Sequence, residues 1–346
     1  LNMIDVLSHP IMPYRQWPMD KFIRISILVM IMFITLVGNI YIIFKLSYHR
    51  QRHRTRLQIF ILNLAIGDLA ICYCTMTSEL FLLIYDQQWI LGNVACKLIL
   101  YIQVVTLAST TFINVAMTYD RYEAICCPFR ACQSSARICF VIALCWLGSC
   151  IVAVPQLFIF KRSLYNESSN RYRCASTGYT AEWQRRVYFT TFATYVLILP
   201  ALCMTVWYIK IIRIISASKK IWEQKVYNKT ATSSSALLTS PTKVKTVKLA
   251  LTIIVVFVVC WTPYMCITLI EIYFNGSFHK PLWLEGVLQT ICFIQSGLNP
   301  FIYIAFNQRR AYNPALIRAA ASTFSQASDR ITRRQQRAQD GSKLFS

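Results

Sequence analysis

The chain is divided into seven long apolar runs that are separated by short polar joints. The runs lie approximately at 22–47, 57–85, 94–122, 137–160, 187–212, 246–274 and 283–306. Each run could cross the roughly 30 Å hydrocarbon core of a bilayer as a helix, because a helix rises about 1.5 Å per residue. Backbone polar groups find no water in lipid, so the pattern predicts a helix for every run.

The third run carries distinctive chemistry at both ends. Its centre, 98–117, has no charged residue, whereas Cys96 stands at one end and Asp120-Arg121-Tyr122 at the other. The stretch from Cys96 to Arg121 is about 38 Å long as a helix, which exceeds the thickness of the hydrocarbon core. One helix could therefore place a disulfide-capable thiol on one side of a membrane and a charged cluster on the other.

The composition supports a polytopic membrane protein. Of the 346 residues, 56% are hydrophobic and only 14% are charged, against about 25% charged in a typical soluble chain. The net charge of +22 would also fit nucleic-acid binding, but the basic residues flank apolar runs and form no stripe on a polar domain. No nucleic-acid partner is therefore expected. Most of the 14 cysteines lie inside apolar runs and are expected to act as small hydrophobic residues.

The basic residues predict the orientation of the chain. With the N-terminus outside, 25 of the 36 lysines and arginines fall on the inner side, in line with the positive-inside rule. The outer loop at 161–186 weakens this bias because it holds six of them. No signal peptide with a cleavage site precedes the first run, so that run is expected to serve as its own insertion signal.

The runs define three segments: an extracellular N-terminus at 1–21, a membrane domain at 22–310, and a cytoplasmic helix with a disordered tail at 311–346. The alanine-rich stretch behind the seventh run predicts a short amphipathic eighth helix on the inner leaflet. Asn166 and Asn275 begin N-glycosylation sequons in loops that are assigned to the outside, so both are expected to be glycosylated.

A polar group inside an apolar run is expensive and therefore informative. Asp68 lies in the middle of the second run, where a carboxylate needs partners or an ion. Candidate partners from other runs are Asn39, Thr110, Ser296 and Asn299. The alternative is a structural knot of hydrogen bonds without an ion.

Prolines interrupt the last three runs. Pro200, Pro263 and Pro300 each remove a backbone donor and clash with the preceding turn, so each predicts a kink. Kinks beside polar residues are typical of hinges between two packings.

One recognisable motif stands in each run. In order, the motifs are Gly38-Asn39, NLAIGDL at 63–69, Cys96, Asp120-Arg121-Tyr122, Trp146, Pro200, CWTP at 260–263 and NPFIY at 299–303. Together they resemble the rhodopsin family (class A) of G-protein-coupled receptors over residues 22–310. The resemblance implies an all-α membrane protein, a seven-transmembrane helix bundle with a short amphipathic eighth helix, in the plasma membrane with its N-terminus extracellular.

The resemblance also implies roles for single residues. Cys96 would pair with Cys174 and tie the third run to the second outer loop, which suits an oxidising exterior. Asp120 would hold Arg121 in the inactive receptor, and Arg121 would meet the C-terminal helix of a G protein in the active one. The residues implied in this switch are Asp120, Arg121, Tyr122, Tyr208, Phe257, Trp261, Pro263, Asn299, Pro300 and Tyr303.

The same resemblance implies a binding site for an allosteric sodium ion, which is the one metal ion expected. The residues that match its site are Asp68, Thr110, Ser296 and Asn299. Gln295 departs from the asparagine that is usual at its place. No other cofactor and no catalytic residue is expected, because the four histidines lie in the tail or in loops and do not converge. The chain is therefore not expected to be an enzyme.

Within the family, three stretches resemble the vasopressin/oxytocin, neuropeptide S and crustacean cardioactive peptide receptors. They lie at 101–110, 120–125 and 154–160. Gln103 and Gln156 match glutamines that line the peptide pocket of the vasopressin/oxytocin group. A glutamine amide both donates and accepts hydrogen bonds, which suits a peptide backbone or an amidated terminus.

Other positions of this pocket are altered. Glu79 and Thr268 each replace a glutamine of the vasopressin/oxytocin group, and Trp261 lies below the ligand. Amine receptors carry an aspartate where this chain has Gln103, and the seventh run lacks the lysine that visual pigments need. The ligand-binding residues expected from the resemblance are Gln103, Gln156, Glu79, Thr268 and Trp261.

The predicted function is that of a neuropeptide-activated receptor that signals to a heterotrimeric G protein. Arrestin, a receptor kinase and membrane lipid are the further partners that the family implies. The alternative on the same fold is a receptor for a non-peptide or chemosensory small ligand. A transporter or channel is disfavoured, because the chain shows no paired repeats with broken helices in both halves.

Overall fold

The computed structural model describes residues 18–48, 55–127, 135–166, 170–227, 241–274 and 282–308. The predicted eighth helix, the tail and Asn275 lie outside these ranges. The chain divides into two compact units, Leu1–Ile302 and Tyr303–Ser346. The described part of the second unit is the end of the last helix.

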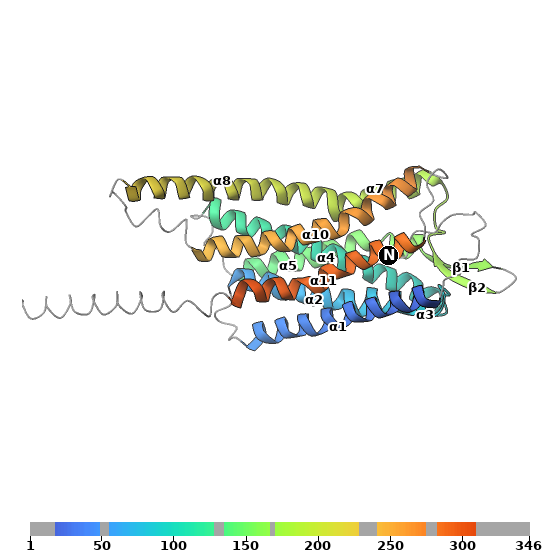
Figure 1. The fold of residues 1–346 in the computed structure, drawn as a ribbon. Helices are drawn as coiled ribbons and strands as arrows, with labels where there is room; N and C mark the ends of the chain where they lie inside the picture. The colour runs from blue at the N-terminus through green and yellow to red at the C-terminus, as the bar shows by residue number, and fades with distance from the viewer. Residues whose placement is uncertain are drawn as a thin grey trace, which may run out of the picture. The chain divides into compact units, whose positions relative to one another are not determined.

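Seven spans that are long and apolar enough to cross a membrane occur in the described residues, and they follow the seven predicted runs (Figure 1). The first three are α1 (Pro18–Tyr48); α2 (Arg56–Ala70), continued by η2 (Ile71–Met76) and α3 (Thr77–Ile84); and α4 (Gly92–Cys126). The fourth is α5 (Ser135–Ala153) with α6 (Gln156–Ile159), and the fifth joins α7 (Glu182–Ala193), η3 (Thr194–Ile198) and α8 (Leu199–Tyr227). The last two are α10 (Pro241–Tyr273) and α11 (Leu282–Gln308). The prediction of an all-α seven-helix bundle is confirmed.

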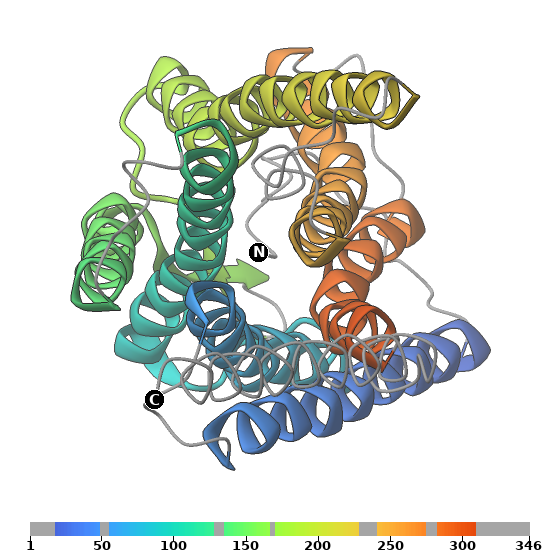
Figure 2. The ribbon, with the colours of Figure 1, turned by 90° about the vertical axis from the view of Figure 1, so that its left-hand side faces the viewer.

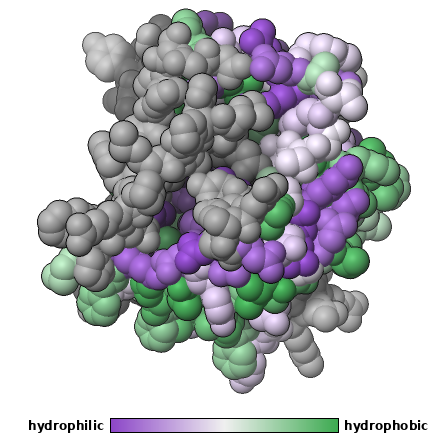
Figure 3. Space-filling view, turned by 90° about the vertical axis from the view of Figure 1, so that its right-hand side faces the viewer, coloured by the Kyte–Doolittle hydropathy of each residue, from purple (hydrophilic) through white to green (hydrophobic). Residues whose placement is uncertain are grey.

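A small antiparallel hairpin joins the fourth and fifth spans. It consists of β1 (Lys161–Asn166) and β2 (Arg171–Ala175), in the register Arg162 opposite Cys174 with an irregularity between Leu164 and Asn166. We call the end of the bundle that carries it the hairpin end, and the opposite end the Arg121 end. Figure 3 looks onto the hairpin end, where hydrophilic residues gather on the face and hydrophobic residues lie along its lower and right-hand edges.

The third span, α4, is the central helix of the first unit. It packs against α2, α5 and α8, which surround it in Figure 2. In its most apolar stretch of 18 residues, 67% of α4 is buried inside the structure, against 22% for the corresponding stretch of the span that contains α5. Side chains such as Phe140 and Ile151 of α5 are exposed, as expected for a surface that faces lipid rather than water.

Two spans contain a turn of π-helix. The π-helical segment η2 interrupts the second span although it contains no proline, and η3 lies just before Pro200 in the fifth. A π turn adds one residue to a helical turn and so rotates everything beyond it by about 100°. The sequence predicted the irregularity at Pro200 but not the one in the second span.

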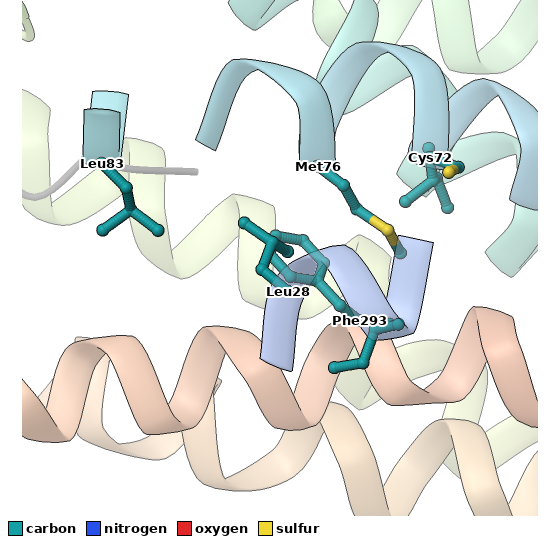
Figure 4. Close-up of a cluster of buried hydrophobic side chains, with 7 residues drawn as sticks. Leu28, Cys72, Met76, Leu83 and Phe293 are labelled. Atoms are coloured by element: carbon teal, nitrogen blue, oxygen red, sulfur yellow. The ribbon is translucent and has the colours of Figure 1, made fainter. Parts of the chain in front are cut away.

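A buried hydrophobic cluster holds α1, η2 and α11 together towards the hairpin end. Figure 4 shows Leu28, Met76 and Phe293 pointing toward one another. Nearer the Arg121 end, α1 approaches α11 so closely that a Cβ atom on Gly38 would lie 2.9 Å from the ring of Pro300. Only glycine permits this approach without a shift of the helices.

Candidate functional site

A disulfide ties the hairpin to the central helix. Cys96 in the first turns of α4 is bonded to Cys174 of β2, with 5.6 Å between their Cα atoms. Trp89 adds a second link, because its backbone N–H donates to the carbonyl of Tyr172. The Trp89 indole N–H donates to the carbonyl of Gly92 at 2.7 Å. The predicted pairing of Cys96 with Cys174 is confirmed.

A small cavity of about 30 Å³ lies beneath this disulfide. We call it the Gln103 cavity. Its polar and aromatic lining comes from the second, third and seventh spans and from the segment before α4, and includes Ser78, Glu79, Trp89, Gln103, Gln289 and Phe293. The structure thus brings together Glu79 and Gln103, two of the five residues expected to bind a ligand.

The π turn explains why Ser78 and Glu79 reach the cavity. Both stand in α3, directly beyond η2, so the rotation that η2 introduces sets the face on which they lie. Gln103 Nε2 donates to Ser78 Oγ at 2.7 Å, which fixes the amide across the cavity floor. Ser78 Oγ in turn donates to the carbonyl of Thr75 at 2.8 Å, so the two side chains form a continuous chain of hydrogen bonds beside the cavity.

Glu79 is buried and has a cationic neighbour on α1. Arg24 Nη2 lies 3.9 Å from Glu79 Oε1, and the exposed fractions of the two side chains are 24% and 8%. The guanidinium rests on the backbone of α11 at Gly286, where a Cβ atom would collide with it. Gly286 therefore leaves the space through which Arg24 reaches Glu79.

The other three expected ligand contacts do not line this cavity. Gln156 is fully buried and donates from Nε2 to the hydroxyl of Tyr188 on α7. Thr268 of α10 forms a side-chain hydrogen bond with Tyr264. Between β2 and α7, the ring of Tyr179 lies 6.3 Å from that of Tyr188, and burial raises the pKa of Tyr179, so its phenol stays neutral.

Trp261 joins the sixth and seventh spans. Its indole N–H donates to Gln295 Oε1 at 3.1 Å, and the centroid of its ring is 6.5 Å from that of Phe257. Cys292 Sγ contacts the carbonyl of Cys260 at 3.5 Å, close to the break that Pro263 makes in the backbone ladder of α10. The two spans are therefore linked beside the proline.

The polar network predicted around Asp68 is present in the middle of the bundle. Asn299 Nδ2 donates to Asp68 Oδ2 at 2.8 Å, and the Ser296 side chain also bonds this carboxylate. Asn39 Nδ2 donates to the carbonyl of Ser296 at 3.2 Å, which ties α1 to α11. Asp68 Oδ1 and Asn299 Oδ1 are buried and have no hydrogen-bond partner. Two such oxygens fit a small hard cation or water. Thr110 instead donates its hydroxyl to the carbonyl of Leu107.

At the Arg121 end, Asp120 of α4 holds two guanidinium groups. Arg121 donates from Nε to Asp120 Oδ2 at 3.0 Å and also from Nη2. Arg56 at the start of α2 donates from Nη1 to the other oxygen, Oδ1, at 3.2 Å. The predicted contact of Asp120 with Arg121 is therefore present, together with a third partner that the sequence did not indicate.

The remaining switch residues surround this cluster or lie on the last helix. Lys210 of α8 lies over the ring of Tyr122, 5.7 Å from its centroid. Tyr208 is buried and interacts electrostatically with Arg121, and its hydroxyl has no hydrogen-bond partner. Pro300 interrupts α11, and Tyr303 follows it three residues later in the same helix.

Comparison with known proteins accounts for this combination of features. Residues 38–303, well over half of the chain, match the family described as 7 transmembrane receptor (rhodopsin family). The chain belongs to the rhodopsin family of seven-transmembrane receptors. Members of this family are signalling receptors rather than enzymes, which agrees with the prediction from sequence, and the protein is a multi-pass protein of the plasma membrane.

Several known receptors are similar to this chain over most of its length. The mesotocin receptor of Rhinella marina is 27% identical, over 82% of this chain and 74% of its own length. The neuropeptide S receptor of Homo sapiens is 28% identical, over 79% of this chain and 73% of its own. The vasopressin V1b receptor of Homo sapiens is 26% identical, over 84% and 74%. These relatives agree with two of the three groups that the sequence resembles; the likeness to crustacean cardioactive peptide receptors stays a prediction.

Several polar residues of the receptor's sites were not anticipated from the sequence. Arg24, Ser78 and Gln289 belong to the hairpin end, Arg56 to the Arg121 end, and Tyr188 contacts Gln156. The available signal for Arg24 was a basic residue within the first turn of an apolar run, because such a charge needs a partner.

Proposed function

We propose that the protein is a peptide-activated receptor that passes ligand binding at the hairpin end to a heterotrimeric G protein at the Arg121 end. The observation that carries the proposal is the Gln103 cavity, in which Gln103, Ser78 and Glu79 converge beneath the Cys96–Cys174 disulfide. The similarity to mesotocin, neuropeptide S and vasopressin V1b receptors supports a peptide as the ligand.

The chemistry of the cavity favours a peptide group over a small cationic amine. The Gln103 amide can pair with a backbone or with an amidated terminus, because it both donates and accepts. The cavity is far too small for a whole peptide, so most of the ligand would contact residues outside it, Gln156, Thr268 and Trp261 among them. Glu79 supplies a carboxylate to the wall of the cavity, and Arg24, which lies 3.9 Å from it, offsets that charge.

Transmission would be a shift between two populations of the receptor. A peptide that presses on Trp261 would loosen its hydrogen bond to Gln295 and favour the state in which α10 pivots near Pro263. Movement of the lower part of α10 would open a groove for the C-terminal helix of the G protein, which is a helix-in-groove contact. Arg121 would leave Asp120 and enter this groove, with Tyr208 turning toward it.

A sodium ion would stabilise the resting state. Asp68, Ser296 and Asn299 supply oxygen atoms of the kind that sodium prefers, and Thr110 lies on the facing helix. The buried oxygens of Asp68 and Asn299 without hydrogen-bond partners support this assignment. The ion would supply a positive charge that keeps the carboxylate ionised.

The orientation that fits this function places the N-terminus and the hairpin end outside the cell. The disulfide at that end suits an oxidising exterior. Asn166, the last residue of β1, and Asn275 would be glycosylated there. The Arg121 end would face the cytoplasm, where arrestin and a receptor kinase are further partners and lipid surrounds the helices.

A ligand screen tests the proposal. Cells that express the receptor with reporters for each G-protein class would be exposed in parallel to a library of amidated peptides and to a library of small metabolites. We expect hits among the peptides, and we expect Gln103→Leu and Glu79→Gln to weaken them at least tenfold. Gln184→Leu is the matched control, because Gln184 pairs with Thr180 away from the cavity. Hits confined to the metabolites would refute the peptide assignment and favour the small-ligand alternative.

A further inference from the structure

We propose that Arg56 is a positioning residue of the activation switch, which keeps Asp120 paired when Arg121 leaves it. The inference rests on the proposed function in one respect, because it takes G-protein coupling to require the release of Arg121. It adds a residue from α2 to a switch that otherwise consists of residues on α4, α8, α10 and α11.

The geometry divides the Asp120 carboxylate between two cations. Oδ2 accepts from Arg121, whereas Oδ1 accepts from Arg56 at 3.2 Å. The carboxylate is almost inaccessible to water, because the Asp120 side chain is only 6% exposed. The Arg56 side chain is 24% exposed. Each oxygen therefore has its own guanidinium, and one of the two can leave while the other stays.

Local structure holds Arg56 in place. Thr55 is the N-cap of α2, and its side chain accepts from the N–H of Gln58 while the Gln58 side chain accepts from the N–H of Thr55. This capping box fixes the first turn of α2, in which Arg56 is the first residue. The neighbouring Leu57 and Phe60 are buried and anchor that turn in the bundle. Arg56 thus approaches Asp120 from a rigid element that the activation of α10 does not need to move.

The burial of Asp120 decides whether loss of Arg56 helps or hinders the release of Arg121. Removing one partner of a buried ion pair is strongly unfavourable when it leaves the other charge without compensation. With Arg56 in place, Asp120 still has a cation after Arg121 departs, so release of Arg121 becomes easier. Without Arg56, Asp120 would depend on Arg121 alone and would hold it more tightly. If Arg56 merely fixed the rotamer of Asp120, its removal would instead loosen Arg121.

Another arginine at the same end serves as a control. Arg137 of α5 lies 3.8 Å from Glu123 of α4, and its side chain is 52% exposed. Glu123 stands almost one turn beyond Asp120 on the same helix, and Arg137 makes no ion pair with Asp120 in the described structure. Arg137→Gln removes a comparable surface cation without touching the Asp120 carboxylate.

The test uses the full chain in lipid nanodiscs and needs no agonist. The affinity of nucleotide-free G protein of each class, and the basal rate of nucleotide exchange, would be measured for wild type, Arg56→Gln, Arg56→Lys and Arg137→Gln. We expect Arg56→Gln to weaken G-protein affinity and basal exchange about three- to tenfold, the size expected for a partly exposed cation beside a buried carboxylate. Arg56→Lys should restore much of the loss, and Arg137→Gln should stay within about twofold of wild type.

The same comparison in the Asp120→Asn background separates the proposed role from direct contact with the G protein. Once Asp120 is neutral, Arg56→Gln should have no further effect. A loss of the same size in both backgrounds would make Arg56 a G-protein contact and overturn the inference, as would a rise in affinity in Arg56→Gln. Wild type that engages no G-protein class would overturn the proposed function, and the inference with it. Surface expression and the thermal midpoint of Arg56→Lys show that the site folds.

Discussion

The Arg24–Glu79 ion pair, which joins α1 to the wall of the Gln103 cavity through Glu79, makes a contribution to stability that follows directly from the structure. Its nitrogen and oxygen are 3.9 Å apart, with a nearly buried carboxylate and a guanidinium that is about one quarter exposed. Two unit charges at this distance attract by about 4 kcal/mol at an effective dielectric constant of about 20. Desolvation and the partial exposure of Arg24 offset much of this attraction, so we expect a net contribution of about 1–2 kcal/mol to the free energy of unfolding.

Single and double variants measure that contribution. Arg24→Gln removes the cation and is expected to lower the thermal midpoint by about 2–4 °C. Glu79→Gln should have a smaller effect, because Arg24 reaches water more readily than Glu79 does. The double variant should lose less than the sum of the single variants, with a coupling energy of about 1 kcal/mol.

A thiol-reactive dye provides the assay on detergent-solubilised receptor. Cys72, Cys260 and Cys292 are buried and free of disulfides, so they react as the bundle unfolds. Lys21→Gln is the matched control on the same helix, because Lys21 pairs at 2.6 Å with Asp86, whose side chain is 59% exposed. We expect that control to shift the midpoint by less than about 1 °C. An unchanged midpoint for Arg24→Gln, with single effects that simply add, would refute the reasoning.

The remaining predictions concern the packing of the bundle, the disulfide and the ion. Gly38→Ala should destabilise the receptor by about 1–3 kcal/mol relative to Gly148→Ala in the same thermal assay. The reason is that a Cβ atom at Gly38 would crowd Pro300, whereas one at Gly148 would meet Phe112 at an ordinary 3.7 Å. Equal midpoints for the two variants would contradict the close approach of α1 to α11. Reduction of the Cys96–Cys174 disulfide should lower the free energy of unfolding by about 2–4 kcal/mol, measured as the midpoint with and without reductant, and a Cys96→Ala/Cys174→Ala variant should show no response to reductant. Replacement of choline chloride by sodium chloride at constant ionic strength should raise the midpoint of wild type but not of Asp68→Asn; an equal response of both proteins would exclude Asp68 as a sodium ligand.

The seven spans could be predicted from the sequence because lipid imposes a strict rule on backbone polar groups. The apolar runs locate the spans, the motifs place Asp68 beside Ser296 and Asn299, and the resemblance pairs Cys96 with Cys174. These features depend on composition and on motif positions that are local in the chain.

What the sequence did not predict depends on the rotation and the approach of whole helices. The π turn at η2 has no proline or glycine to announce it, yet it sets the direction of Glu79. Arg24 reaches Glu79 across Gly286 of α11, where a Cβ atom would meet its guanidinium, and Arg56 pairs with Asp120 where the start of α2 lies beside α4. Such contacts arise from tertiary packing, which periodicity along the chain does not encode.

If Arg121 couples the two ends of the receptor, ligand binding at the hairpin end and signalling at the Arg121 end are separable steps. The most direct test is to measure, on the same membranes, the binding of a labelled peptide agonist and agonist-dependent nucleotide exchange for wild type and Arg121→Ala. We predict that Arg121→Ala keeps peptide binding and surface expression and loses nucleotide exchange. Full agonist-dependent exchange by Arg121→Ala would contradict the account.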